Sequence, residues 1–196
     1  MVFASNNKSK LQEIKEIFND YKIESLKDKN VTLDVEEDKT TFYENALKKA
    51  ISYYNEIKEP VIADDSGLIV SELNWPGVYT NRFLGNNKTD REKNLAIINR
   101  VDKECQTRNA EVVCVLVYYD GKNTISATGK LKGKIPSHPR GENGFGFDEI
   151  FEYKNKTLAE LSTSEKNNLS ARKLAAEELK KKLLSTTSVD KTKYMV

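Results

Sequence analysis

Apolar residues recur along the chain with two periods, which predict short strands that alternate with helices. Runs of small or β-branched apolar residues predict strands at 2–4, 61–63 and 110–119. Residues 123–130 follow the turn Asp120-Gly121 with alternating character, so they predict a partner strand. Spacings of three and four residues predict the buried faces of four helices. These faces are Leu11, Ile14, Ile17 and Phe18; Phe42, Ala46, Ala50 and Tyr53; Leu95, Ile98 and Val101; and Leu174, Leu179 and Leu183.

Polar residues mark where helices begin. Thr41, Thr89 and Ser162 each precede a glutamate by three residues, which is the pattern of a capping box. Ser170 is suited to cap a final helix. We therefore expect a helix after each of these residues and a frayed, flexible tail over residues 185–196.

The segment Val61–Leu68 carries the most suggestive chemistry. Its sequence, VIADDSGL, runs from a short apolar strand into Asp64 and Asp65, and then into Ser66-Gly67, where the backbone can turn. We expect a second strand or hairpin arm over 68–73. Acids at the carboxyl end of a strand can hold a divalent cation or take a proton from water. A turn in which the two acids only bond backbone N–H groups explains the same residues.

The junction between the first strand and the first helix has the composition of an anion site. Residues 5–10 read SNNKSK, and a helix start offers free N–H groups and a positive dipole end beside the lysines. Ser5, Asn7 and Lys10 could therefore hold a phosphate. An ordinary helix cap with solvated lysines explains them about equally well.

The helix predicted after Thr41 places polar groups beside its buried face. Thr41, Asn45 and Lys49 follow one another at four-residue spacing, so they share one side of the helix. An amide and an ammonium group there could serve a cleft, although a solvated face explains a single lysine equally well. The acidic stretch 31–38 just before the helix could supply another metal ligand.

A glycine-rich segment, GFGFD, follows the last long strand. Glycine permits close approach of the backbone to a flat ligand, Phe145 or Phe147 could stack on a base, and Asp148 could accept hydrogen bonds from ring N–H groups. A glycine-rich turn whose aromatic rings fill the core is the alternative, and we expect it for one of the two phenylalanines. Lys166 and Arg172 lie near helix starts that face the same ligand.

Composition narrows the function classes. The 196 residues, 38% of them hydrophobic, are enough for a sizeable core, and 32 basic against 30 acidic residues give a net charge of +2. That balance argues against a nucleic-acid binder that relies on bulk charge. His138 is the only histidine, so a histidine metal site is excluded. Cys105 and Cys114 lack the spacing of metal ligands or of a disulfide framework, and Cys114 lies in an apolar run that predicts burial.

Location and domain organisation follow from what the sequence lacks. It contains no run of about 18 apolar residues, so we expect no membrane span. The first residues lack the basic and long apolar segments of a signal peptide, so we expect a cytoplasmic protein. No repeat or linker interrupts the chain, so we expect one domain over residues 1–184.

Together and in this order, the motifs resemble the inosine triphosphate pyrophosphatase family, also called the Ham1-like or dITP/XTP pyrophosphatase family. The similarity runs from residue 1 to about 184, and it is specific because so many motifs occur in the same order. The matching segments are Ser5-Asn6-Asn7-x-x-Lys10; Glu37 with Thr41-Phe42-x-Glu44-Asn45-Ala46-x-x-Lys49-Ala50; Ala63–Leu68; Pro76-Gly77; Arg82; Pro139-Arg140-Gly141; Gly144–Asp148; Glu165-Lys166-Asn167; and Ser170-x-Arg172.

The resemblance implies both a fold and an activity. The fold is α/β, with a long twisted mixed sheet flanked by helices, two lobes and a central cleft, usually in a homodimer. The activity is Mg²⁺-dependent hydrolysis of non-canonical purine nucleotides (ITP, dITP and XTP) to monophosphate and pyrophosphate, with Mn²⁺ as a possible substitute. Such an enzyme keeps these nucleotides out of nucleic acid.

The resemblance also implies a role for each matching residue. Glu37, Asp64 and Asp65 hold the metal, Asp65 is the general base, and Lys49 assists catalysis. Phosphate is held by Ser5, Asn6, Asn7, Lys10, Asn45 and Lys49. The base is bound by Ser66, Phe145, Gly146, Phe147, Asp148, Lys166, Ser170 and Arg172. Arg82 contacts the cleft or a partner subunit.

Three departures from the family pattern leave alternatives open. Ala171 stands where the family usually has a histidine that helps to hold the base, Glu149 replaces a proline, and Thr80-Asn81 replaces Ser-Ala. The first change removes a donor at the base, so a family member with altered base preference is one alternative. A non-catalytic nucleotide- or RNA-binding module is a second, which the balanced charge and the acidic residues disfavour.

Overall fold

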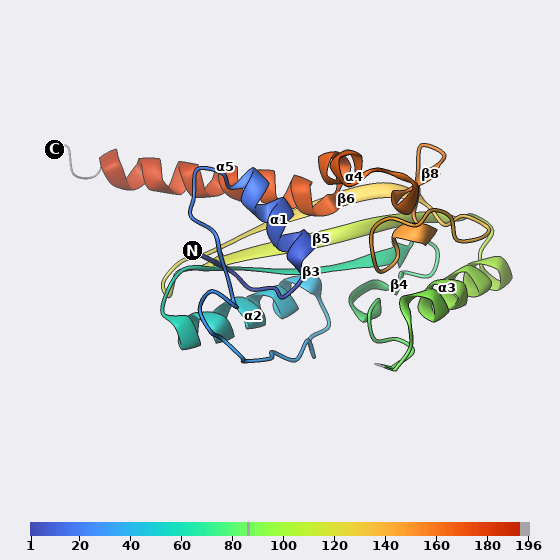
Figure 1. Ribbon diagram of the computed structural model, residues 1–196, viewed down its shortest axis with the longest axis horizontal. Helices are drawn as coiled ribbons and strands as arrows, with labels where there is room; N and C mark the ends of the chain where they lie inside the picture. The colour runs from blue at the N-terminus through green and yellow to red at the C-terminus, as the bar shows by residue number, and fades with distance from the viewer. Residues whose placement is uncertain (86, 193–196) are drawn as a thin grey trace. The chain divides into compact units, whose positions relative to one another are not determined.

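The structure is a computed structural model that describes residues 1–85 and 87–192, without the side chains of 187–192 (Figure 1). The chain divides into two compact units. The first unit consists of Met1–Asp65, Cys114–Gly129 and Arg172–Val196, and the second of Ser66–Val113 and Lys130–Ala171. Strands β3 (Val61–Val70), β5 (Asn109–Tyr119) and β6 (Thr124–Lys134) contribute residues to both.

The first unit is a sheet covered by helices on both faces. Its strand order is β2-β1-β3-β5-β6, and β1 (Val2–Phe3) is parallel to both β2 (Glu24–Ser25) and β3. Figure 1 shows α1 (Lys8–Ile17) and α5 (Ala171–Thr192) on one face and α2 (Phe42–Ile57) on the other. Strands buried on both faces read as continuous apolar runs, as Val112–Val117 does here.

Small and branched side chains close the core of the first unit. Ile14 and Phe18 from the first helical segment are fully buried, and Leu11 and Ile17 are half-buried. Ala46, Ala50 and Tyr53 of α2 are buried as predicted. Leu179 and Leu183 of α5 are buried too, but the prediction for Leu174 is wrong: it is 42% exposed, and Ala175 and Ala176 occupy the inner face instead. Cys114 is buried, as predicted, and burial raises the pKa of its thiol to about 12.

The second unit has strand order β3-β5-β6-β7-β8, with β4 (Trp75–Pro76) antiparallel to β3. Strands β7 (Glu152–Tyr153) and β8 (Lys156–Thr157) are short. The helices are α3 (Asp90–Glu104) and α4 (Thr163–Leu169), and single 3₁₀ turns are η1 (Gly77–Tyr79), η2 (Asp148–Ile150) and η3 (Leu158–Glu160). The fold is therefore α/β with a mixed sheet flanked by helices, as the sequence predicts.

The predicted caps are present. Thr89 and Ser162 each form a complete capping box with Glu92 and Glu165. Thr41 accepts the N–H of Glu44 at the start of α2. Each cap satisfies N–H groups that would otherwise lack a partner at the helix start, which is why these three boundaries follow from local sequence.

Three predictions about the elements are wrong. The backbone does not turn at Ser66-Gly67, because β3 runs through to Val70 between its sheet neighbours. Leu95 of α3 is 41% exposed, and Ile97 lies inward in its place, beside Ile98 and Val101. The helix α5 does not end near residue 185 but extends to Thr192, and no proline or glycine in 185–192 interrupts it. The remaining predicted tail residues, 193–196, lie outside the described part of the chain.

Thr80, one of the departures from the family pattern, has a structural role in the second unit. Its buried hydroxyl accepts the N–H of Leu68 at 3.0 Å and donates to the carbonyl of Gly77 at 2.6 Å. We expect Thr80→Val to lower the free energy of unfolding by about 1–3 kcal/mol, because the buried N–H of Leu68 loses its acceptor and the carbonyl of Gly77 loses one of its two donors. Urea denaturation measures this, with Thr128→Val on the exposed side of β6 as the control. Equal stability of the two variants would contradict the prediction.

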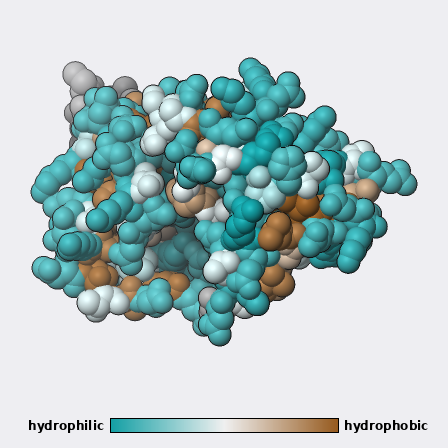
Figure 2. All heavy atoms as spheres, turned by 45° about the vertical axis from the view of Figure 1, so that its right-hand side comes forward, coloured by the Kyte–Doolittle hydropathy of each residue, from teal (hydrophilic) through white to brown (hydrophobic). Residues whose placement is uncertain are grey.

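The surface is predominantly polar. In Figure 2 most of the face is hydrophilic and its hydrophobic atoms form small groups. Among residues 1–85 and 87–192, none of the helices is long and apolar enough to cross a membrane.

Candidate functional site

Consecutive carboxylates on β3 are at the centre of a charged cluster in the first unit. This acid cluster comprises Glu37, Asp64 and Asp65 together with Lys10, Lys49 and Arg172. Side chains of successive strand residues point to opposite faces of a sheet. Asp64 accordingly contacts α1 and α5, and Asp65 contacts α2. The two acids therefore have different environments.

Asp64 is 1% exposed and is held between two cations. One of its oxygens, Oδ2, lies 2.9 Å from Lys10 Nζ and 3.1 Å from Arg172 Nη2. Burial alone raises the pKa of this carboxyl, but the charges of Lys10, Arg172 and Lys49 outweigh it and hold the pKa well below its usual range. Asp64 is thus ionised at neutral pH.

Asp65 is 5% exposed, and its pKa is shifted in the opposite direction. The amide of Asn45, itself fully buried on α2, donates to Asp65 Oδ2 at 2.9 Å. Burial, and then the neighbouring charges of Glu37 and Asp64, raise the pKa of Asp65 to about 6, although Lys49 and Asn45 oppose this. A carboxyl that titrates near neutral pH can exchange a proton during a reaction, as a general base must.

Lys49 lies among all three acids of the cluster. Its Nζ donates to Glu37 Oε1. Burial lowers the pKa of Lys49, but the charges of Asp64, Glu37 and Asp65 more than compensate and raise it. The α2 helix, whose start is fixed by Thr41, thus places an ammonium group and the Asn45 amide on one side, as the spacing of these residues predicts, and the structure brings both beside Asp65.

Residues 5–10 form the start of α1. Ser5 Oγ accepts the N–H of Asn7 at 3.2 Å, and Asn7 Oδ1 accepts the N–H of Lys10 at 3.1 Å. The helix-cap interpretation is therefore correct for Asn7. Asn6 is exposed. The cap also orients Lys10 toward Asp64, so the same segment brings a cation to the acid cluster.

Arg172 lies in this cluster, and it is joined there by a residue that the sequence did not reveal. This residue is Glu13: Arg172 Nη1 donates to Glu13 Oε2 at 3.1 Å, and both side chains are largely buried. Burial lowers the pKa of Arg172, but Asp64, Cys114 and Glu13 raise this pKa by more than burial lowers it. The guanidinium therefore remains charged. Glu13 occupies the inner face of α1, where a charge signals a buried partner. The partner could not be identified from sequence because it lies 159 residues away.

The donors of the acid cluster are chemically suited to Mg²⁺, a hard cation that prefers oxygen ligands. Within the described ranges, no group of three or more His, Cys, Asp or Glu side chains is arranged to hold a metal ion. Mg²⁺ commonly uses only one or two carboxylates, with water and phosphate oxygens as its other ligands. Glu37 and Asp65 fit that use, since their mutual repulsion raises the pKa of Asp65 and a cation would relieve it.

The glycine-rich loop, residues 141–147, carries the predicted base-binding groups in the second unit. Phe145 is 41% exposed, and Lys166 Nζ lies 4.4 Å from the centre of its ring. Asp148 is buried, its Oδ2 accepts the N–H of Phe145 at 2.8 Å, and Lys166 Nζ donates to the same oxygen. Phe145, Asp148 and Lys166 thus form one connected group with an accessible aromatic ring.

The other predicted base-binding residues have varied positions. Phe147 is half-buried, so neither phenylalanine of the loop is fully in the core, where Ile150 and Phe151 lie instead. Ser66 is half-buried on β3, and Ser170 is buried at the end of α4. Arg82 lies over the ring of Tyr79, with Cζ 5.1 Å from the ring centre.

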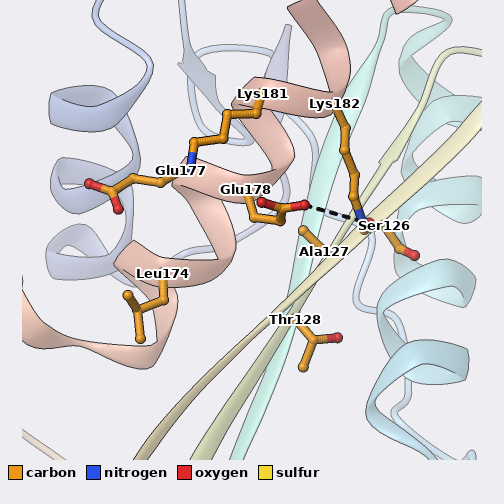
Figure 3. A pocket seen from close by; sticks show the side chains of 8 residues that line it. All are labelled: Ser126, Ala127, Thr128, Leu174, Glu177, Glu178, Lys181 and Lys182. Carbon is orange, nitrogen blue, oxygen red and sulfur yellow. Dashed lines mark hydrogen bonds and ion pairs between the residues drawn. The ribbon is translucent and has the colours of Figure 1, made fainter. Parts of the chain in front are cut away.

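A groove of about 630 Å³ lies elsewhere in the first unit, between α5 and β6. Figure 3 shows Leu174, Glu177, Glu178, Lys181 and Lys182 of the helix beside Ser126, Ala127 and Thr128 of the strand. Lys182 Nζ donates to the carbonyl of Ser126 and lies 3.8 Å from Glu178 Oε1. None of the predicted functional residues lines the groove, so we do not assign it to the site.

The fold and the cluster place this chain among α/β proteins in which buried carboxylates of a central strand lie beside lysines of the flanking helices. The model of the Ham1 family matches residues 1–182. The chain is 42% identical over 190 residues to the dITP/XTP pyrophosphatase of Aquifex aeolicus (strain VF5), an alignment that covers 91% of this chain and 94% of the relative. It is 40% identical over 191 residues to the dITP/XTP pyrophosphatase of Bacillus subtilis (strain 168), with 93% and 96% covered.

Solved structures agree with the sequence comparison. The HAM1 protein from Coxiella burnetii superimposes with a TM-score of 0.86 at 36% sequence identity, over 94% of this chain and 98% of that protein. The Ham1 protein of Staphylococcus aureus gives a TM-score of 0.85 at 37% identity, with the same coverage. This chain belongs to the Ham1 family.

Proposed function

We propose that this protein is a nucleoside-triphosphate pyrophosphatase that hydrolyses ITP, dITP and XTP to the monophosphate and pyrophosphate. The observation that carries the proposal is Asp65, a buried carboxyl whose pKa is raised to about 6 beside Lys49 and Glu37. Relatives of similar length are named dITP/XTP pyrophosphatases, which supports the same activity. We further propose that the protein acts in the cytoplasm as a homodimer.

Asp65 is the proposed general base. Its carboxylate would take a proton from the water that attacks the α-phosphorus, and Asn45 fixes its orientation through the bond to Oδ2. Lys49 remains charged in this environment and would offset the negative charge that develops on the leaving pyrophosphate. Lys10, with Ser5, Asn6 and Asn7 at the start of α1, would bind phosphate oxygens.

Mg²⁺ is the proposed cofactor, with Mn²⁺ as a possible substitute. Glu37 and Asp65 would hold it, with Asp64 contributing its negative charge nearby. Bound there, the ion would neutralise phosphate charge and polarise the bond that breaks. Asp64 already has Lys10 and Arg172 as partners, so its larger contribution would be to keep these two side chains in place.

The glycine-rich loop of the second unit would recognise the base. Hypoxanthine and xanthine present an acceptor at O6 and a donor at N1, whereas adenine presents the reverse. Phe145 would stack on the ring and Lys166 would supply a donor. A donor that faces the amino group of adenine leaves both groups unpaired, which costs a few kcal/mol.

A pyrophosphate-release assay tests the proposal. With Mg²⁺ present we expect turnover of ITP, dITP and XTP to exceed that of ATP by at least about a hundredfold in kcat/KM, since unpaired polar contacts discriminate this strongly. Addition of EDTA is expected to stop the reaction. Ala171 is buried and offers no polar group, so comparable turnover of ITP and ATP would support altered base preference instead. No pyrophosphate from any substrate would refute the enzyme proposal.

A further inference from the structure

The backbone of Gly146 is held on both of its polar groups by side chains of α3. Its N–H donates to Asp90 Oδ2 at 3.0 Å, and its carbonyl accepts from Asn94 Nδ2 at 2.8 Å. Gly146 has a φ of +63°, a conformation that glycine adopts without strain. The glycine-rich loop therefore takes its position from a helix that carries none of the residues predicted to bind substrate.

Glu149 completes this attachment. Asn94 is 2% exposed, and its amide nitrogen donates a second bond, of 3.0 Å, to Glu149 Oε1. An amide nitrogen has two N–H groups, and here both have an acceptor. Glu149 thereby fixes the amide with its nitrogen toward the loop. The other carboxylate oxygen, Glu149 Oε2, accepts from Arg91 Nη1 at 3.0 Å.

The two contacts of Glu149 differ in strength. The Arg91 side chain is 63% exposed, and a solvent-exposed ion pair contributes little. The bond from the buried Asn94 amide has a charged acceptor and is shielded from water, so it is the stronger of the two. The attachment of the Gly146 carbonyl thus depends on the path from Glu149 through Asn94, whereas Asp90 holds the N–H of Gly146 separately.

Phe145 is fixed from the opposite side. Its N–H donates to Asp148 Oδ2, which also accepts from Lys166 Nζ. A cavity of about 210 Å³ in this unit is lined by Asp90, Arg91, residues 141–146, Asp148 and Glu149. Phe145 and the α3 attachment thus border the same space, and the ring that would stack on a base is adjacent in sequence to the glycine that α3 holds.

We propose that Glu149 is a positioning residue for base recognition: through Asn94 it holds Gly146 and so sets the orientation of Phe145. The inference rests on the proposed function, because it assigns Glu149 to the base-binding part of that site. Glu149 does not touch the reacting atoms. Its loss raises the conformational entropy that the loop gives up on binding a base, and it leaves the phosphate end of the substrate unaffected.

Separate binding measurements with the two products test this. Isothermal titration calorimetry with IMP reports the base-binding part, and titration with pyrophosphate in the presence of Mg²⁺ reports the phosphate part. We expect Glu149→Ala to weaken IMP binding about tenfold, which is a change of about 1.4 kcal/mol, and to leave pyrophosphate binding within about twofold. In steady-state assays, KM for ITP should rise about tenfold with kcat within about twofold.

Matched variants separate positioning from general damage. Asn94→Asp is isosteric but cannot donate to Gly146 or Glu149, so it should reproduce the effect, and it carries the test if Glu149→Ala does not fold. Glu149→Gln keeps an oxygen for Asn94 and should restore IMP affinity to within about threefold of wild type. Arg91→Met removes only the exposed ion pair, and Lys103→Ala removes an exposed charge from the last turn of α3; each should change IMP affinity less than twofold.

The outcomes distinguish this inference from the proposed function. If the wild-type protein neither hydrolyses ITP nor binds IMP, the proposed function fails and the inference fails with it. If the wild-type protein does both while Glu149→Ala and Asn94→Asp match Lys103→Ala, the inference alone is overturned. Equal weakening of IMP and pyrophosphate binding would also overturn it, since that result indicates general disruption.

Discussion

Asp65→Asn is expected to lower kcat for ITP hydrolysis by about 10²- to 10⁴-fold, the usual contribution of a positioned general base. Asparagine has nearly the same shape and keeps an oxygen for Asn45, so the fold should persist. Initial rates of pyrophosphate release measure the effect, with exposed Asp34→Asn as the matched control. A variant that retains more than a tenth of wild-type activity would contradict the role of Asp65.

The same substitution has a second expected effect, on the pH dependence of stability in EDTA. The pKa of Asp65 is raised from 3.8 to about 6 on folding, so its stabilising contribution is complete below pH 4 and is lost as pH rises through about 6. Above that range the wild-type protein contains a costly buried charge. We therefore expect Asp65→Asn to be more stable than wild type at pH 8 by about 3 kcal/mol, and to lose this advantage at pH 4.

Thermal unfolding at both pH values measures this difference. Stability and activity should thus change in opposite directions at one residue, as expected where a strained group is retained for function. Unchanged stability at pH 8 would show that the unfolded and folded proteins bind the Asp65 proton alike.

Arg172→Met is expected to lower the free energy of unfolding at pH 7 by about 3–5 kcal/mol, because the buried carboxylates of Glu13 and Asp64 both lose their ion pair with the guanidinium. For a chain of this size that corresponds to a melting temperature lower by roughly 10 °C. Arg91→Met is the matched control, since the exposed pair of Arg91 with Glu149 contributes less than about 1 kcal/mol.

The loss of stability caused by Arg172→Met should also depend on pH. Folding lowers the pKa of Asp64, so its ion pairs stabilise the protein above the unfolded value of about 4 and cease to do so as pH falls through the folded value. The difference in stability between wild type and Arg172→Met should therefore be constant from pH 6 to about pH 4 and shrink as the pH falls below about 4. A difference that also stays constant below about pH 4 would indicate that Arg172 acts through packing alone.

Features that depend on neighbouring residues could be predicted from the sequence. The caps at Thr41, Thr89 and Ser162 involve residues three positions apart, and each of them starts a helix as expected. The proximity of Asn45 and Lys49 to β3 also follows from helical spacing, once the helix is placed on the sheet.

Features that depend on distant partners could not be predicted. The path of β3 through Ser66-Gly67 is decided by the strands beside it, which outweigh the turn preference of those two residues. The exposed Leu95 and Leu174 show that a helical period fixes the spacing of a buried face but leaves its limits to tertiary packing. Glu13 and the α3 attachment of Gly146 have partners more than 50 residues away.

The alternation of side chains along β3 has a consequence for mutational tolerance. A single peptide step separates a carboxylate that is permanently ionised from one that exchanges its proton, and only the pleat keeps them apart. Deleting or inserting one residue between the start of β3 and Asp64 would turn each carboxylate to the opposite face of the sheet, because a slip of one position reverses the direction of every side chain. Length variation in this strand should thus be far less tolerable than a change of residue type.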